Sequence, residues 1–260
     1  MKFNKTLITA SLAIVCLIFA SCAEDNGSDP TGGTDNTTVE SFPMTEGSYW
    51  ITENYVTDQD DQLTGEITID SMVVGESVVK AGKTGRVFVN YSLNQENIYK
   101  KSGETIYRTV DDKLYVFGGM LTEMMDLPMD MSGIIDEEWM ILIDFKNSIW
   151  EVARIEITKD DSIGFNGMLI TAEMDIIGRS TNKTKDFVVD GNTFNAQEYI
   201  IDIEGQFTIS AIPIPISFDR KMHIWFADAV GLVQQYLEPA TIMEQPNPGE
   251  MKNLIRYHIK

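Results

Sequence analysis

The side chains that could do chemistry in this sequence are mostly carboxylates. The 260 residues include 40 Asp and Glu but only 2 His and 2 Cys. A glycosidase needs two carboxyl groups that face each other about 5–9.5 Å apart, and one sequence does not reveal such a pair. The adjacent acidic pairs have the setting of solvated turns; they are Asp60-Asp61, Asp111-Asp112, Glu137-Glu138 and Asp160-Asp161. No nucleophile elbow, zinc-protease motif or phosphate-binding loop occurs, so we name no catalytic residue.

The chain has few residues that could bind a metal ion or a cofactor. Asp58, Asp60 and Asp61 offer the oxygen ligands that calcium prefers, but the segment lacks the Gly and the final Glu of an EF-hand loop. A hairpin turn is the stronger interpretation. Five methionines between Gly118 and Glu138 could hold copper(I), yet neither His lies near them in sequence. The sequence therefore predicts no metal and no cofactor.

The methionine-rich segment has a simpler interpretation as a hydrophobic plug or lid. Methionine is flexible and polarizable, and it suits an irregular core or an adaptable binding surface. If this segment closes one mouth of a curved sheet, then Met124, Met125 and Trp139 are expected among the first contacts of an apolar ligand.

The net charge of −20 argues against nucleic acid as a partner. Phosphate contacts need Lys and Arg to displace counterions, and the chain has twice as many acidic as basic residues. Solubility and repulsion from anionic surfaces account for this acidity.

The N-terminus predicts a lipid anchor. Lys2 and Lys5 precede an apolar run over residues 7–20, and small residues then lead to Cys22. This pattern is typical of a secretory signal peptide, and the run is too short to span a bilayer. Residues 19–22 resemble a lipoprotein cleavage box, which implies that Cys22 becomes the acylated first residue. The alternative is an ordinary cleaved signal with a free Cys.

Residues 1–21 are accordingly expected to be the signal peptide, 22–41 the lipidated Cys with a flexible acidic tether, and 42–260 a β-rich domain. The tether has too few apolar residues to bury enough surface to offset the conformational entropy that it would lose on folding, so we expect it to be flexible. Glu24 and Asp25 resemble the export signal of surface lipoproteins in the Bacteroidota, while Ala23 is not the Asp that retains lipoproteins on the inner membrane. We expect an outer-membrane location through the acyl anchor, with exposure at the cell surface as a further hypothesis.

The sequence of the domain predicts antiparallel strands. Period-two alternation of β-branched and aromatic residues recurs about a dozen times, separated by Gly, Asn and Asp turns such as Asp190-Gly191. The pattern predicts an all-β domain with a single curved antiparallel sheet or an open half-barrel. A slip of the apolar phase predicts a β-bulge near Ala153-Arg154. Pro213 and Pro215 predict a sheet edge, because proline donates no ladder hydrogen bond.

Two short sequences resemble sites of O-glycosylation in exported Bacteroidota proteins, which join Asp, Ser or Thr and an apolar residue. These are Asp70-Ser71-Met72 and Asp161-Ser162-Ile163. The resemblance implies that Ser71 and Ser162 are modified.

Three longer phrases resemble uncharacterised lipoproteins of the Bacteroidota. They are Phe42-Pro43 followed by Gly47 and Trp50, the stretch 189–194, and Trp225-Phe226-Ala227 followed by Val230-Gly231-Leu232-Val233. The phrases consist of turn glycines and anchoring aromatics, so the resemblance implies an envelope lipoprotein and supplies no functional residues.

These observations together predict a lipid-anchored envelope protein with a binding or structural role outside catalysis. An apolar small molecule held in the curved sheet, or another envelope protein, is the expected partner. The alternative is a surface hydrolase that acts on glycans or peptides through carboxylates. It would require a cleft with two facing carboxyl groups, at least one of them with a raised pKa.

Overall fold

Alternating apolar and polar residues form strands throughout the described part of the chain. The computed structural model describes residues 42–94, 97–118, 138–158, 163–165, 168–210, 212–242 and 245–260. The strands are β1 (Tyr49–Thr57), β2 (Leu63–Lys80), β3 (Lys83–Leu93), β4 (Tyr99–Val110), β5 (Lys113–Phe117), β6 (Trp139–Asp144), β7 (Ile149–Ile157), β8 (Ile163–Phe165), β9 (Met168–Val189), β10 (Asn192–Ile209), β11 (Ile212–Ala227), β12 (Gly231–Leu237), β13 (Ala240–Ile242), β14 (Gln245–Asn247) and β15 (Gly249–His258).

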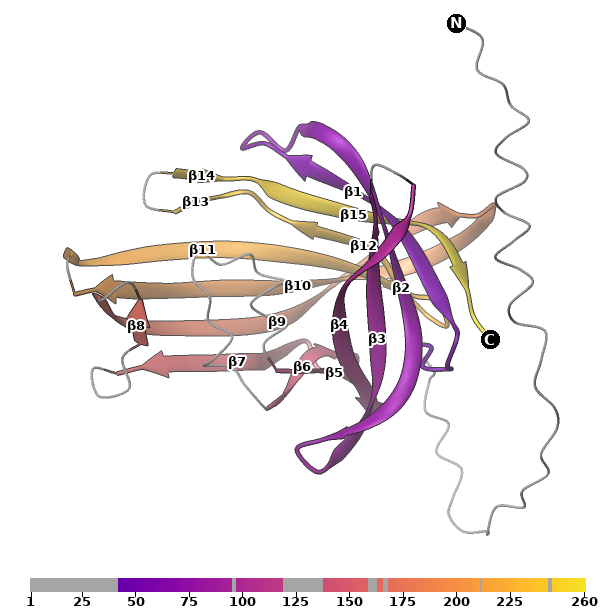
Figure 1. Ribbon diagram of the computed structural model, residues 1–260, viewed down its shortest axis with the longest axis horizontal. Helices are drawn as coiled ribbons and strands as arrows, with labels where there is room; N and C mark the ends of the chain where they lie inside the picture. Colours follow the sequence, from indigo (N-terminus) through magenta and orange to yellow (C-terminus); the bar gives the residue numbers. More distant parts are fainter. Residues whose placement is uncertain are drawn as a thin grey trace, which may run out of the picture. The chain divides into compact units, whose positions relative to one another are not determined.

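One antiparallel sheet of 13 strands carries the fold, in the order β6-β5-β4-β3-β2-β1-β15-β12-β11-β10-β9-β7 with β8 beside β9. The sheet curves until its two end strands, β6 and β7, come into contact. Trp150 on β7 joins them, because its indole Nε1 donates to the carbonyl oxygen of Ile141 on β6 at 3.1 Å. In Figure 1, the long strands β9–β11 run across the picture and β2–β4 cross them at a steep angle.

The predicted fold class is thus confirmed, since the curved antiparallel sheet is nearly closed into a barrel. Bulges help to bend the sheet. The register of β7 against β9 shifts between Glu151 and Ala153, which confirms the predicted bulge to within about two residues. Beside it, Gly178 leaves room for the indole, since a Cβ there would lie 2.0 Å from Trp150.

Tight turns connect most consecutive strands. Asp190 and Gly191, with φ angles of 50° and 80°, join β9 to β10 as predicted. The Asp58–Asp61 segment joins β1 to β2, and the Asp58 carboxylate accepts hydrogen bonds from the backbone nitrogens of Asp60 and Gln62, each at 2.9 Å. These bonds are those of a turn, in line with the hairpin interpretation. The turn expected at Asp160-Asp161 lies outside the described residues.

The proline-containing segment agrees with its prediction only locally. β11 is an internal strand between β10 and β12, whereas Pro213 and Pro215 predicted a sheet edge. However, the ladder between β11 and β12 begins only at Met222. Among the described strands, residues 212 and 216–221 pair with β10 alone, and Pro213 and Pro215 lie where the register with β10 shifts. The prolines therefore occupy the part of the strand that is locally an edge, where a missing backbone donor costs least.

The core fills the inside of the curved sheet. Its fully buried side chains include Phe88, Ile143, Ile176, Ile201 and Met222. The described residues contain no helix long and apolar enough to cross a membrane. The methionine-rich segment predicted to be a plug lies almost entirely outside the described residues.

Candidate functional site

A cavity of about 410 Å³ lies on the inner face of the sheet, lined by side chains from β1–β6, β11, β12 and β15 and by Phe42. Its volume falls within the range of small-molecule sites, which is about 300–1,000 Å³. Inward-facing residues of these strands are apolar toward one end of the cavity and polar toward the other. The two ends are called here the aromatic floor (Phe42, Trp50, Tyr107 and Phe226) and the polar row (Asp70, Ser92, Gln235 and Lys252).

The aromatic floor is a packed cluster of rings. Phe42 stacks on Trp50 with ring centroids 5.7 Å apart and lies 5.8 Å from Phe226. The Tyr107 ring meets Phe42 edge-on at 5.5 Å. Burial raises the pKa of Tyr107 to about 12, so its phenol stays neutral at physiological pH.

Two of the sequence phrases described above meet at this floor. The indole Nε1 of Trp50 donates to the carbonyl oxygen of Val230 at 2.7 Å. Gly231 has φ of +92°, and a Cβ there would lie 2.7 Å from the Phe42 ring. The start of the domain is therefore hydrogen-bonded to the turn between β11 and β12. A side chain at position 231 would displace the Phe42 ring.

The polar row lies one or two inward-facing positions farther along the strands. Asp70 pairs in register with Thr52 and with Ser92, while Lys252 pairs with Gln235. Asp70 accepts a hydrogen bond from the Asn54 amide at 2.6 Å. Gln235 is only 8% exposed.

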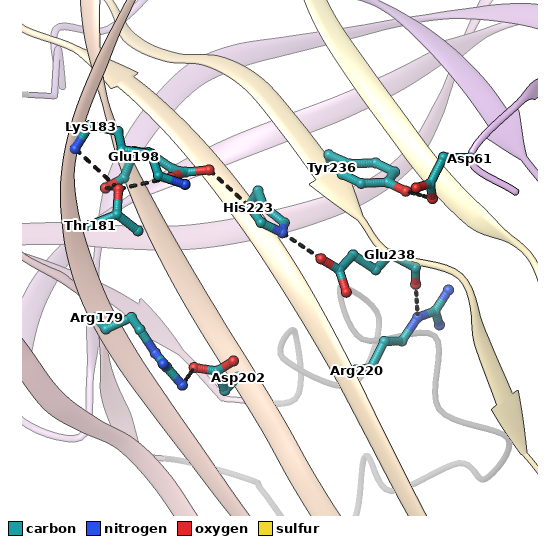
Figure 2. Close-up of polar contacts among 10 residues, drawn as sticks. All are labelled: Asp61, Arg179, Thr181, Lys183, Glu198, Asp202, Arg220, His223, Tyr236 and Glu238. Carbon is teal, nitrogen blue, oxygen red and sulfur yellow. Dashed lines mark hydrogen bonds and ion pairs between the residues drawn. The ribbon is translucent and has the colours of Figure 1, made fainter. Parts of the chain in front are cut away.

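A second polar site lies on the outer face of the sheet and is drawn in Figure 2, which shows His223 between two carboxylates. His223 on β11 has its Nδ1 3.0 Å from Glu198 on β10, and its Nε2 2.7 Å from Glu238, which follows β12. Each ring nitrogen of His223 is thus within hydrogen-bond distance of a carboxylate oxygen. We call Glu198, His223 and Glu238 the histidine clamp.

Further groups complete the clamp. Thr181 Oγ1 donates to Glu198 at 2.8 Å, and Lys183 lies 3.4 Å from the same carboxylate. The Tyr236 ring stacks against His223 with centroids 5.9 Å apart, and its hydroxyl donates to Asp61. Neither ring nitrogen of His223 is left for a substrate.

The electrostatics of the buried carboxylates differ from those of a general acid. Burial raises the pKa of Glu198, but hydrogen bonds from His223 and Thr181 and the positive charges of His223 and Lys183 outweigh it, so this pKa lies below its ordinary value. At Asp144, hydrogen bonds from Asn147 and Lys146 and the charge of Lys113 likewise outweigh burial and lower the pKa. A hydrolytic acid needs the opposite shift.

The remaining buried carboxylate in the described part of the chain, Asp202, pairs with Arg179 apart from the clamp, as Figure 2 shows. The carboxyl groups of Glu198 and Glu238 do face each other, but the imidazole ring fills the space between them. In the described part of the chain, no group of three or more His, Cys, Asp or Glu could hold a metal ion.

The sequence-predicted site residues are not brought together at the cavity. Trp139 begins β6, where its Nε1 donates to the carbonyl of Lys80 at 3.0 Å and Arg108 lies 5.5 Å above its ring. It is not among the residues that line the cavity, so its contact with a ligand stays a prediction. Met124, Met125, Cys22 and Ser162 lie outside the described residues. Ser71 is half-buried in β2, opposite Ile51 and Tyr91, and is one of the residues that line the cavity. Its modification also stays a prediction.

Sequence reasoning missed the polar row. A signal existed, because the alternation that places Val233 and Leu237 inward also places Gln235 inward. Polar residues at strand positions that point into an apolar core indicate either the open edge of the core or a binding site.

Comparisons with known proteins add little. No protein-family model and no curated protein matches the chain. Among solved structures, a presumed lipoprotein from Parabacteroides distasonis aligns over 84% of this chain and 98% of its own, with 16% identity and a TM-score of 0.48. A presumed exported protein with a YmcC-like fold from Bacteroides fragilis aligns over the same shares, with 13% identity and a TM-score of 0.41. At these values neither likeness indicates what this chain does.

Proposed function

We propose that this protein is a lipid-anchored envelope protein that holds a small apolar ligand inside its curved sheet. The observation that carries the proposal is the cavity of about 410 Å³ with its floor of packed aromatic rings. Apolar pockets with a few convergent polar groups are the usual form of ligand sites. The volume limits the occupant to a single small molecule or one short acyl chain.

The anchor rests on the N-terminal sequence. The basic start, the short apolar run and the small residues before Cys22 support cleavage and acylation at that Cys. Two acyl chains suffice for stable attachment, since each buried CH₂ contributes about 0.8 kcal/mol. Sorting to the outer membrane, and from there to the cell surface, is part of the proposal and is supported by Ala23, Glu24 and Asp25.

The anchor is tested by metabolic labelling with a palmitate analogue and by separation of the two membranes. The wild type should carry label and sediment with the outer membrane, while Cys22→Ala should carry none. Label on the variant, or wild-type protein in the inner membrane, would contradict this part of the proposal.

The cavity is tested by filling it. Gly103 on β4 lines the cavity, and a Cβ there would approach only Asn90 Nδ2, at 4.0 Å. Gly103→Leu should therefore place its side chain in the cavity with little strain. Its matched control is Glu104→Leu, at the next position of the same strand, where the side chain is exposed.

The lipidated full chain in nanodiscs is exposed to a photoactivatable fatty alcohol with a diazirine at the end of its tail. The wild type and Glu104→Leu should be labelled on the peptides that contain Trp50 and Phe226, and Gly103→Leu should lose most of this labelling. Equal labelling of Gly103→Leu, or no labelling of these peptides in the wild type, would overturn the proposal.

A further inference from the structure

The polar row contains an amide that faces the cavity and has no hydrogen-bond partner among the described residues. Gln235 is 8% exposed, lines the cavity and has no hydrogen-bond partner among the described residues. Its amide atoms are not among the side-chain atoms that are both buried and unpaired, so they reach the cavity, where a bound molecule can meet them. Its neighbour Gln234, by contrast, donates to Asn253 at 2.6 Å. The spare hydrogen-bonding capacity is therefore specific to the side chain that faces the cavity.

The charges of the row limit what can meet this amide. Asp70 contributes a carboxylate with Asn54 as its hydrogen-bond donor, and Lys252 contributes an ammonium group 3.4 Å from Glu250. Both line the cavity. A ligand head with a full negative charge would meet Asp70, and one with a full positive charge would meet Lys252. An uncharged head avoids both conflicts.

The hydrogen-bonding groups of the row favour a head that both donates and accepts. The Gln235 amide and the Ser92 hydroxyl each do both, Asp70 accepts and Lys252 donates. The aromatic floor at the other end offers only ring faces and one neutral phenol. The cavity is thus divided along its length into an apolar and a mixed polar part.

We infer that the cavity takes an uncharged amphiphile, whose tail lies on the aromatic floor and whose head, a glycerol ester or an amide, hydrogen-bonds with Gln235 and Asp70. This inference rests on the proposed function and names the ligand class of the same site.

The test uses three photoactivatable probes with the same tail and with a monoacylglycerol, a carboxylate or an amine as head. The lipidated full chain in nanodiscs is labelled with each probe at equal concentration. The monoacylglycerol should label the Trp50 and Phe226 peptides at least about fivefold more strongly than either charged probe, since a hydrogen bond contributes about 1 kcal/mol and 1.4 kcal/mol is tenfold.

Three variants test whether residues of the polar row cause the preference for the uncharged probe. Gln235→Leu should weaken labelling by the monoacylglycerol about five- to tenfold. Asp70→Asn should raise labelling by the carboxylate probe, and Lys252→Met should raise labelling by the amine probe. Glu204→Gln, on the exposed part of β10, is the control and should change nothing.

The outcomes separate the two proposals. If all probes label the floor equally and Gln235→Leu has no effect, while Gly103→Leu still abolishes labelling, then the cavity binds a ligand but the inferred head is wrong. A charged probe that labels best in the wild type would overturn the inference in the same way. Labelling that survives Gly103→Leu would overturn the proposed function itself.

Discussion

The histidine clamp and the polar row are both polar sites in a sheet that is mostly apolar inside, but they treat hydrogen bonds differently. In the clamp, both nitrogens of His223 and the Glu198 carboxylate find partners within the protein. In the row, Gln235 finds none among the described residues. The two sites are close in the fold, because His223 and Gln235 lie on the neighbouring strands β11 and β12.

The difference indicates that the clamp stabilises the fold and that the polar row serves binding. A fully satisfied buried network stabilises and specifies the fold, whereas a polar group that faces a cavity without a protein partner is available to a ligand. The clamp holds together β10, β11 and the end of β12. The row faces an internal space of ligand size. Mutations at the clamp should therefore act on stability, and mutations in the row on binding.

The largest effect is expected at the clamp. Glu198→Ala removes the acceptor for His223 and Thr181 and the counter-charge for Lys183. Leaving the hydrogen-bond donors of His223 and Thr181 without their acceptor costs about 1–3 kcal/mol. The free energy of unfolding, measured by chemical denaturation, should fall by about this amount, while probe labelling per folded molecule stays at the wild-type level.

Glu204→Ala is the matched control, since Glu204 lies on the same strand but is exposed. It should change the stability by no more than about 0.5 kcal/mol. If Glu198→Ala were as mild as its control, or if it abolished labelling of the folded protein, the proposed division between the two sites would be wrong.

A smaller effect of opposite sign is expected in the row. Gln235→Leu replaces an amide that has no partner among the described residues with an apolar side chain in a largely apolar surrounding, so the ligand-free protein should become more stable by up to about 1 kcal/mol. Gln234→Leu, one residue earlier, removes a satisfied amide and should lower the stability by about 1 kcal/mol. Thermal unfolding of the two variants checks this. A loss of stability in both would show that Gln235 has a partner in the folded protein.

The fold could be predicted from the sequence further than the site could. Period-two alternation and turn residues such as Asp190-Gly191 are local, so they predicted the strands, the hairpins and the bulge of β7. The cavity depends on which strands meet across the sheet. Gln235 and Asp70 are far apart in sequence, and only the order β12-β15-β1-β2 brings them to one inner face. The clamp could not be predicted from the sequence either, because Glu198, His223 and Glu238 share no motif.

The smallest expected effect is on the pH dependence of stability, and it concerns the clamp alone. The pKa of Glu198 in the folded protein lies below its ordinary value of 4.5, so the unfolded chain binds the proton first as the pH falls. The stability contributed by this carboxylate is present above about pH 4.5 and is lost as the pH falls through its folded pKa.

Glu198→Gln should therefore flatten the decline in the free energy of unfolding below pH 4.5, and the rest of the decline should persist because the pKa of Asp144 is lowered as well. Urea denaturation at several pH values between 7 and 3 measures both slopes. Gln235→Leu should leave the slope unchanged, since an amide does not titrate. A flatter slope in Gln235→Leu, or none in Glu198→Gln, would mean that the two sites are coupled, and the ligand site would then respond to the protons that the clamp binds.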